Sequence, residues 1–282
     1  MRAACIAIEF AVRARAENGA RPDALLGSGE ALPMVMSLSW AASGSLNPRY
    51  GKHSMIVVHH LNNSRSQRVL WLLEELGVEY RVQRYQRDAK SMLAPAALRS
   101  VHPLGKSPAI TDDTLPAGEQ TVAESGAIVE YLVDRYGQGS GLKPADGTPE
   151  RRRYTYWLHY AEGSAMSPLL LSLIFSKVRT APMPFFVKPI ARGIADKVMR
   201  DFVTPQLDTH FDYMESELNQ HPWFAGDAFT AADIQMSFPI EAASSRGVLS
   251  ARPKLVDFLA RIHARPAYLR ALEQGGQYDL LR

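Results

Sequence analysis

Two hydrophobic patterns follow each other along residues 55–85 and predict a strand, a helix and a second strand. Residues 55–61, MIVVHHL, and residues 78–85, VEYRVQRY, are rich in β-branched and aromatic residues. Between them, four apolar positions recur at the spacing of one helix face: Val69, Leu72, Leu73 and Leu76. Gly77 follows them, where a left-handed C-cap is favoured. The pattern therefore predicts a strand–turn–helix–strand unit.

The pattern continues through residue 137 with more short elements. We expect a short irregular helical connection over 92–102, strands over 107–112 and 120–125, and a helix from 125 that Gly137 closes. The resulting order is βαβαββα. Alternating βαβ units favour parallel pairing, whereas two strands joined by the short loop 112–119 pair antiparallel. We therefore predict an α/β domain with a mixed sheet.

A change of composition after residue 136 predicts a domain boundary. The stretch GQGSGLKPADGTPE holds four glycines and two prolines, a composition typical of a linker. Everything beyond it has helical periodicity: 151–175, a long segment interrupted by two prolines, a helix after Thr230 and one last helix over 253–273. Thr230 and Asp233 have the spacing of a capping box. We assign 55–137 to the α/β domain, 138–150 to a linker and 151–282 to an all-α domain.

Residues 1–54 lack a sustained period of 2 or 3.6 and are rich in Ala, Gly, Ser and Arg. We interpret them as a disordered extension, or as the product of a start assigned too early, because Met55 opens the first convincing strand. An Arg-rich targeting peptide is the minor alternative. We expect this segment to contribute little to stability.

Composition and charge argue against nucleic-acid and membrane partners. Of 32 Lys and Arg and 29 Asp and Glu residues, six and four lie in 1–54, which leaves 26 against 25 for the remainder. The one dense basic run, 151–153, is the solvated start of a predicted helix, whereas nucleic-acid binding needs cations gathered on one face. No apolar run approaches the roughly 20 residues of a membrane span. We therefore expect a cytoplasmic protein with no nucleic-acid or membrane partner.

The cysteine and histidine positions exclude several chemistries. Cys5 is the single cysteine, so an intramolecular disulfide, a CxxC redox pair and a cysteine-based zinc site are excluded. His59 and His60 are neighbours on a predicted strand and point to opposite faces, so they cannot chelate one metal together. We expect no metal. Thiol chemistry in this protein needs a thiol that a ligand brings.

A polar cluster, NNSRSQR at 62–68, stands between the first predicted strand and helix. Free backbone N–H groups and the positive end of the helix dipole favour an anion there. Ser66 should lie within the first helical turn, whereas Ser64 is near the N-cap and can face a ligand. The plain alternative is that Ser64 only caps the helix, and Asn63 is a further possible hydrogen-bond donor.

Two more motifs converge on the same sheet edge. GKSPAI places Pro108 at the first position of a strand, where a cis bond would expose the backbone of Ser107 to an extended ligand. AESGAI places Glu124 and Ser125 at a strand-to-helix turn. This turn provides a carboxylate and a second helix N-terminus whose backbone N–H groups can bind an anion. These features suit a peptide-like ligand that carries carboxylates and an ammonium group.

With NNSRSQR, HPLGKSPAI and AESGAIVEYL in this order, the chain resembles the soluble glutathione S-transferase superfamily, closest to its bacterial and fungal serine-type branch. The resemblance covers about residues 55–282. It implies a thioredoxin-like N-terminal domain, an all-α helical C-terminal domain, and a homodimer that binds glutathione at the domain boundary. No Tyr or Cys ends the first strand, unlike in the tyrosine- and cysteine-dependent classes.

The resemblance also implies roles for single residues. Ser64 resembles the serine that hydrogen-bonds the glutathione sulfur, and some relatives use an amide near the position of Asn63. The other implied glutathione contacts are Ser107 and Pro108 for the tripeptide backbone, Glu124 and Ser125 for the γ-glutamyl end, and Lys106, with Lys90 as a weaker candidate, for the glycyl carboxylate. Tyr160 and Met166 are the candidates for the electrophile pocket.

Three functions follow from this assignment. The first is conjugation of glutathione, as a co-substrate and without a further cofactor, to small hydrophobic electrophiles in detoxification. The second is a glutathione-dependent disulfide reductase or peroxidase that uses the same thiolate. The third is a non-catalytic binding module of the same fold. The anion-stabilising position of Ser64 argues against the third function, and the sequence does not separate the first two.

Overall fold

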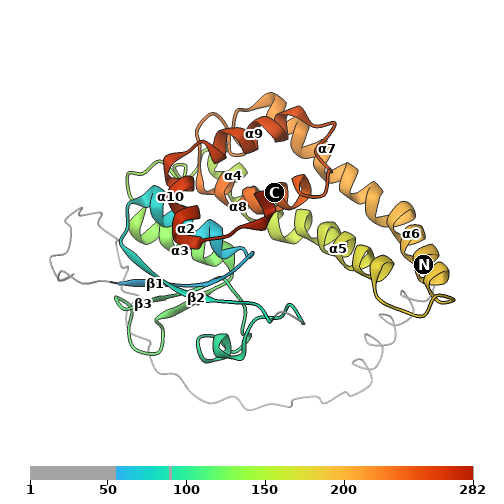
Figure 1. The fold of residues 1–282 in the computed structure, drawn as a ribbon. Coiled ribbons are helices and arrows are strands. Elements are labelled where there is room, and N and C mark those ends of the chain that lie inside the picture. Colours follow the sequence, from blue (N-terminus) through green and yellow to red (C-terminus); the bar gives the residue numbers. More distant parts are fainter. Residues whose placement is uncertain (1–54, 89–90, 282) are drawn as a thin grey trace, which may run out of the picture. The chain divides into compact units, whose positions relative to one another are not determined.

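The computed structural model describes residues 55–88 and 91–281. These residues lie in one compact unit, which joins a mixed sheet to a set of helices (Figure 1). The predicted extension over 1–54 falls outside the described residues. The thioredoxin-like α/β domain and the helical C-terminal domain expected from the sequence are both present and are confirmed.

The described part of the chain contains a four-stranded sheet in the order β2–β1–β3–β4. Its strands are β1 (Ile56–Leu61), β2 (Tyr80–Tyr85), β3 (Ala109–Asp112) and β4 (Thr121–Ala123). β1 pairs parallel with β2, and β3 pairs antiparallel with both β1 and β4. The predicted order βαβαββα and the antiparallel final pair are therefore confirmed.

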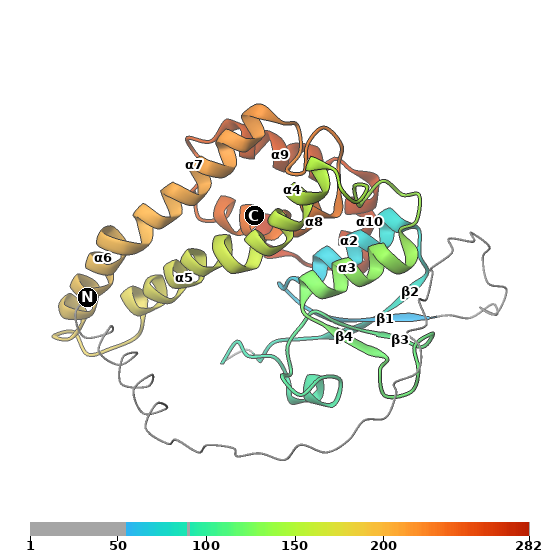
Figure 2. The same ribbon diagram turned by 180° about the vertical axis from the view of Figure 1, so that it is seen from behind.

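Two helices cover one face of this sheet (Figure 2): α2 (Ser66–Leu76) and α3 (Ser125–Tyr136). Of the four predicted apolar positions on α2, Val69, Leu72 and Leu73 are fully enclosed, and Leu76 is partly buried against the core. Gly77 ends α2 at φ +64°, and its N–H donates to the Leu73 carbonyl, as a left-handed C-cap does. The short 3-10 helix Ala96–Ser100 lies on the other side of the sheet, in the connection from β2 to β3.

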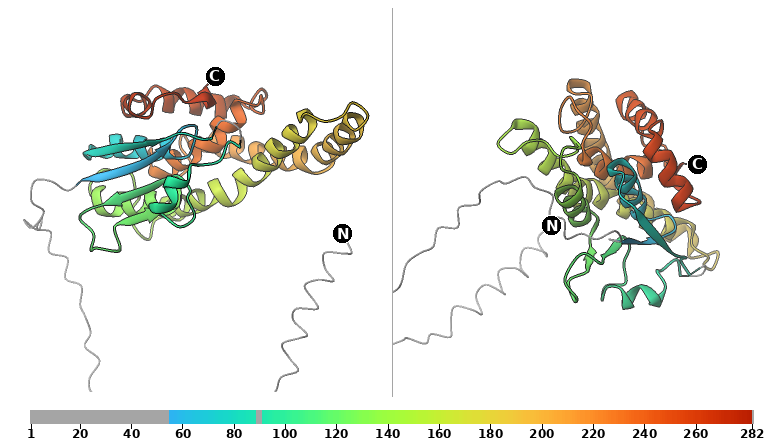
Figure 3. Two further views of the ribbon diagram at one scale, coloured as in Figure 1. Left: turned by 60° about the horizontal axis from the view of Figure 1, so that its bottom comes forward. Right: turned by 90° about the vertical axis from the view of Figure 1, so that its left-hand side faces the viewer.

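The helical part follows α3 without a further strand among the described residues. Its helices are α4 (Pro149–Tyr160), α5 (Met166–Thr180), α6 (Lys188–Val198), α7 (Thr204–Gln220), α8 (Ala231–Ser244), α9 (Pro253–His263) and α10 (Pro266–Gly275), with a 3-10 turn at Asp279–Leu281. α8 is buried on all sides from residue 231 to 243. Thr230 and Asp233 form the expected capping box at its start. α5 and α6 pack side by side and extend away from the sheet (Figure 3).

The last predicted helix is wrong in one respect, because the structure divides it into two. α9 ends at His263 and α10 begins at Pro266. The proline ring disfavours the helical conformation for the preceding Arg265, which is extended at φ −71° and ψ 131°. The break lets α10 turn back and pack on α2, which brings the C-terminal residues to the sheet (Figure 1).

Two π-helical turns interrupt the helices where the sequence pattern predicts regular α-helix. They span Ala161–Ala165 and Met199–Val203. Each precedes a proline, Pro168 or Pro205, whose missing N–H and ring disturb the carbonyl four residues earlier. That carbonyl belongs to Ser164 in the first turn and to Asp201 in the second. The wider turn accommodates the clash without ending the helix.

The boundary between the two domains stays a prediction. α3 ends at Tyr136 and α4 begins at Pro149, so no regular helix or strand occupies the residues between them in the described chain. α2 packs against both α8 and α10, which explains why the sheet and the helices form one compact unit.

Candidate active site

The turn before β3 presents a backbone edge beside the end of β1. The peptide bond between Ser107 and Pro108 is cis. Pro108 is buried and Ser107 is half-buried, and the Ser107 hydroxyl donates to the His59 carbonyl at 2.9 Å. Lys106, immediately before them, is exposed. The structure therefore places a fixed serine and an exposed cation at this edge.

The turn from β4 into α3 contains a strained residue. Glu124 has φ +73° and ψ 125°, a conformation that residues other than glycine rarely adopt, and it is exposed. Such strain persists only where the surrounding structure enforces it, and it is concentrated at functional sites. Ser125 begins α3 and is buried, and its hydroxyl accepts hydrogen bonds from Gln235 at 3.4 Å and from Arg68 at 3.5 Å.

A cavity of about 280 Å³ joins these two turns. Its walls are Arg65, His102, Leu104, Lys106, Ser107, Pro108, Ala123, Glu124, Ser125 and Glu162. Five of the residues predicted to contact the ligand therefore meet around one cavity, although they come from separate motifs. The wall carries both cations and carboxylates, so it can bind a ligand that has charges of both signs.

The sequence did not indicate Glu162, which binds two arginines of the α2 start. Its carboxylate accepts from Arg65 Nε at 2.8 Å and from Arg68 Nη1 at 2.6 Å. Burial acts to raise the pKa of the Glu162 carboxyl, but the charges of Arg68 and Arg65 outweigh it and hold that pKa below its ordinary value. Arg68 is 1% exposed, so this is an ion pair with one buried member. The pairs fix the α2 start against the π-helical turn Ala161–Ala165.

Ser64 lies just outside the cavity wall, two residues before α2 begins. Its hydroxyl oxygen is 2.7 Å from Ser66 Oγ and 3.4 Å from Ser107 Oγ, and it accepts from the Ser66 N–H at 3.3 Å. Ser66 lies in the first turn of α2, as its position in the motif predicts. The contact with Ser107 connects Ser64 to the cavity, whereas the Ser66 N–H contact is a local hydrogen bond at the helix start.

Asn63 is directed away from this cavity. Its side-chain amide donates from Nδ2 to Asp279 Oδ2 at 2.7 Å, and its Oδ1 accepts from the Asp279 N–H at 2.8 Å. These two bonds hold the C-terminal turn against the start of α2. The geometry therefore favours Ser64 over Asn63 as the donor to a ligand in the cavity.

The remaining predicted residues do not meet there. Tyr160 is buried among aromatic rings of α4 and α7, and its hydroxyl bonds His210 Nδ1 at 2.6 Å. Burial raises the pKa of that phenol. Met166 begins α5 and packs against the core. Neither residue lines the cavity. Lys90 lies outside the described residues.

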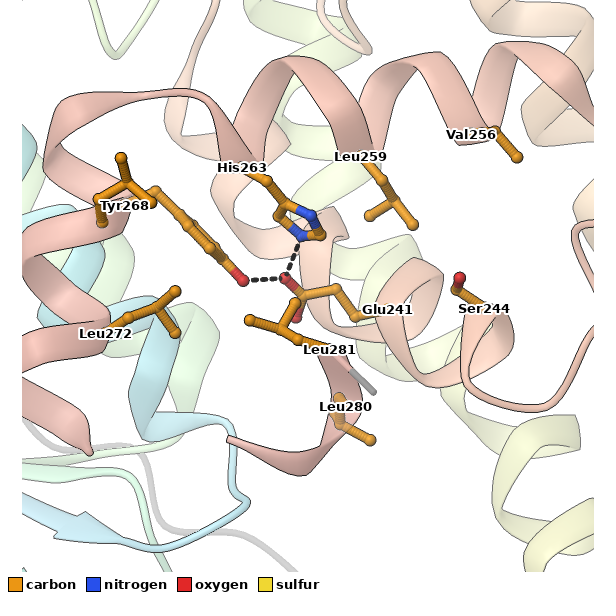
Figure 4. A pocket seen from close by; sticks show the side chains of 10 residues that line it. Glu241, Ser244, Val256, Leu259, His263, Tyr268, Leu272, Leu280 and Leu281 are labelled. Atoms are coloured by element: carbon orange, nitrogen blue, oxygen red, sulfur yellow. Dashed lines mark hydrogen bonds and ion pairs between the residues drawn. The ribbon is translucent and has the colours of Figure 1, made fainter. Parts of the chain in front are cut away.

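A larger cavity, about 490 Å³, lies between α8, α9, α10 and the C-terminal turn, and none of these residues lines it (Figure 4). Five of its ten lining residues are leucines. At its base Glu241 accepts from Tyr268 Oη at 2.6 Å and interacts with His263 Nε2 at 3.1 Å, and Tyr278 donates to its other oxygen at 2.7 Å. Because these bonds occupy both carboxylate oxygens, we assign Glu241 a structural role that links the last helices.

The described residues contain no group of three or more His, Cys, Asp or Glu side chains that could hold a metal ion. Within the same part of the chain, no helix is both long and apolar enough to cross a membrane.

The chain matches two family descriptions. "Glutathione S-transferase, N-terminal domain" matches residues 53–134, and "Glutathione S-transferase, C-terminal domain" matches residues 185–271. Glutathione S-transferase 1 of Saccharomyces cerevisiae is 34% identical over 224 residues, which cover 78% of this chain and 95% of that protein. This chain belongs to the glutathione S-transferase family.

Two further comparisons agree with this assignment. Glutathione S-transferase 3 of Schizosaccharomyces pombe is 37% identical over 224 residues, which cover 78% of this chain and 88% of the relative. The crystal structure of a glutathione S-transferase from Actinobacillus pleuropneumoniae superimposes with a TM-score of 0.67 at 32% identity, covering 81% of this chain and 96% of that one. The family and the transferase class expected from the sequence are thereby confirmed.

Proposed function

We propose that this transferase binds glutathione in the 280 Å³ cavity and conjugates the glutathione thiolate to small hydrophobic electrophiles. The observation that carries the proposal is the meeting of the Ser107–Pro108 edge, the strained Glu124 turn and the α2 start around one cavity. Tripeptide thiols have a backbone, an ammonium group and two carboxylates, and the cavity wall has a partner for each.

In this proposal four of the wall residues each bind one part of glutathione. The Glu124 carboxylate pairs with the γ-glutamyl ammonium, and Ser125, at the start of α3, binds the neighbouring carboxylate with its backbone N–H and the helix dipole. Ser107 pairs with the peptide backbone, next to Pro108. Lys106 meets the glycyl carboxylate, and Lys90 remains a weaker candidate for the same contact.

Ser64 is proposed to stabilise the sulfur anion. A free thiol with a pKa of about 8.5 is only a few per cent thiolate at neutral pH, and the thiolate is the nucleophile. Lowering that pKa by about 2 units needs roughly 2.7 kcal/mol. One hydrogen bond to a charged acceptor contributes about 1.5 to 3 kcal/mol, and the dipole of α2 adds about 0.3 to 1 kcal/mol. One hydroxyl at a helix start is therefore sufficient.

The proposal also covers the electrophile side, the assembly and the location. Tyr160 and Met166 stay a prediction for the electrophile side, because neither lines the cavity. A homodimer is proposed because α5 and α6 expose large apolar side chains, among them Leu170, Ile174, Ile190 and Ile194. We also propose a cytoplasmic location, where glutathione is available.

The test is an assay of the purified protein with glutathione and three co-substrates: a chloronitrobenzene, an organic hydroperoxide and a small disulfide. We expect conjugation of the chloronitrobenzene to be the fastest reaction. Turnover of the hydroperoxide or disulfide alone would favour the reductase or peroxidase alternative, which uses the same thiolate. Glutathione binding without any turnover would favour the binding module.

A further inference from the structure

Arg65 lines the 280 Å³ cavity but has no ligand contact in the proposed function. It follows Ser64 directly and precedes the first residue of α2. Its Nε atom donates to both oxygens of Glu162, at 2.9 and 2.8 Å, and its guanidinium lies over the Phe238 ring, 5.0 Å from the centroid. The carboxylate and the ring therefore hold the Arg65 side chain in one place on the wall.

The outer part of the Arg65 guanidinium is available to a ligand. A guanidinium has one N–H on Nε and two on each Nη. Within the described part of the chain, only the Nε of Arg65 has a hydrogen-bond partner. The side chain is 35% exposed, so a molecule in the cavity can reach the Nη groups. Their planar arrangement fits a carboxylate, which accepts two parallel hydrogen bonds from a guanidinium.

The charges on this part of the wall leave one positive charge in excess. Glu162 pairs with both Arg65 and Arg68, and neither arginine has a second carboxylate partner among the residues that the structure describes. Arg68 is 1% exposed, so it is too buried to contact a ligand. An anion in the cavity therefore meets the excess charge at Arg65. A ligand ammonium is left to Glu124, because both oxygens of Glu162 already accept from arginine.

Arg65 belongs to the same part of the wall as Ser125. Arg68 Nη1 donates to Glu162 Oε1 at 2.6 Å and to Ser125 Oγ at 3.5 Å. Because one nitrogen atom contacts both, Glu162 and Ser125 are close neighbours, and Arg65 is bound to the same Glu162 carboxylate. Ser125 begins α3, where the helix N–H groups and dipole favour an anion. The α3 start and Arg65 therefore adjoin the position proposed for the γ-glutamyl carboxylate.

We propose that Arg65 binds the α-carboxylate of the γ-glutamyl residue through its Nη groups, and that Glu162 is the positioning residue that holds Arg65 there. This inference rests on the proposed function, in which glutathione occupies the cavity. It adds a basis for specificity, because the protein then selects thiol peptides that have a free α-carboxylate at the γ-glutamyl end. The role of Arg65 is separate from that of Lys106, which is proposed to meet the glycyl carboxylate.

The test measures affinities by calorimetry for the wild type and Arg65→Gln, each with two peptides. One peptide is glutathione, and the other is an analogue in which an aminobutyryl group replaces the γ-glutamyl residue. The analogue keeps the ammonium group, the thiol and the glycyl carboxylate and lacks only the α-carboxylate. We expect Arg65→Gln to weaken glutathione binding by about ten- to a hundredfold and analogue binding by less than about threefold, because the analogue has no partner for the guanidinium.

Arg152→Gln is the matched control, because Arg152 is exposed near the start of α4 and does not line the cavity. It should leave both affinities unchanged. A third peptide, γ-glutamylcysteine, lacks the glycyl residue and keeps the α-carboxylate. Arg65→Gln should weaken its binding by the same factor as that of glutathione.

Three results would overturn the inference and leave the proposed function standing, since the wild type binds glutathione in each. They are equal weakening of glutathione and the aminobutyryl analogue by Arg65→Gln, an unchanged affinity of this variant for glutathione, and a weakening that disappears with γ-glutamylcysteine. The last result would place Arg65 at the glycyl carboxylate. A wild type that does not bind glutathione would overturn both the proposed function and the inference.

Discussion

At the scale of single residues, the candidate site could be predicted wherever a local pattern carries the information. Ser64, Pro108 and Ser125 each stand at a junction between elements that the hydrophobic periodicity predicts, and the structure has those junctions. Glu162 could not be predicted, because its partners Arg65 and Arg68 are more than 90 residues away and an ion pair has no periodicity. The hydrogen bond between Tyr160 and His210 could not be predicted from the sequence for the same reason.

Glu124 provides a residue-scale prediction for binding. Glu124→Ala should weaken glutathione binding by about 2 to 5 kcal/mol in calorimetry if the ligand ammonium pairs with this carboxylate away from water. Glu119→Ala is the control, because Glu119 is exposed in the loop between β3 and β4 and does not line the cavity. Equal affinities of the wild type and Glu124→Ala would remove Glu124 from the binding site.

His60 provides a prediction for stability against pH. Its pKa is about 4 in the folded protein and 6.5 in the unfolded chain, so between these values the unfolded chain binds a proton that the folded protein does not. The free energy of unfolding should therefore fall as the pH drops from about 6.5 to about 4, by up to roughly 3 kcal/mol in total from this group.

Urea unfolding of the ligand-free protein at several pH values checks this, with His60→Leu as the comparison. His59 also has a lowered pKa, mainly from burial, but it contributes to both proteins and cancels in the difference. The variant should lose stability less steeply with acid than the wild type. Parallel curves for the two proteins between pH 6.5 and pH 4 would contradict the account.

At the scale of elements, proline explains where the sequence pattern and the structure diverge. The helix face of α2 and its glycine cap could be predicted because spacing and φ preference are local properties. Pro266 divides one predicted helix into α9 and α10, and Pro168 widens the turn that presents Glu162. Both prolines can be read from the sequence, but the hydrophobic pattern does not show whether a proline ends a helix or only widens one turn. The outcome depends on packing, of α10 against α2 and of the π-helical turn Ala161–Ala165 against α8.

The ion pairs between the α2 start and the π-helical turn Ala161–Ala165 give a prediction at this scale. Glu162→Gln leaves the guanidinium of Arg68 buried without a carboxylate, which should lower the free energy of unfolding by about 2 to 4 kcal/mol. Asp257→Asn is the control, because its pair with Arg261 is exposed and should contribute about 0.5 kcal/mol or less. Similar losses in urea unfolding for both variants would show that Glu162 does not hold the elements together.

At the scale of the whole molecule, the sequence predicted the α/β domain and the helices after it because each has its own periodicity. The return of the C-terminal turn to the sheet was not predicted, because the Asn63–Asp279 contact joins residues 216 positions apart. The exposed face of α5 and α6 was also not apparent, since its apolar positions have the spacing of ordinary core residues.

That face gives the prediction for assembly. Light scattering should give the mass of a dimer for the wild type, and Ile190→Glu with Ile194→Glu should shift it toward the monomer, because two charges enter an apolar contact. Val256→Glu, at an exposed apolar position on α9, should leave the dimer intact. A monomeric wild type at micromolar concentration would contradict the proposed homodimer.

The central claim is that Ser64 stabilises the glutathione thiolate beside the 280 Å³ cavity. It is tested most directly by ultraviolet titration of the thiolate bound to the wild type, Ser64→Ala and Asn63→Ala. We predict a bound thiol pKa well below the free value in the wild type and in Asn63→Ala. In Ser64→Ala that pKa should rise, and kcat should fall by roughly ten- to a thousandfold, as expected when one preorganised donor is lost. A thiol that titrates in Ser64→Ala as it does in the wild type would contradict the account.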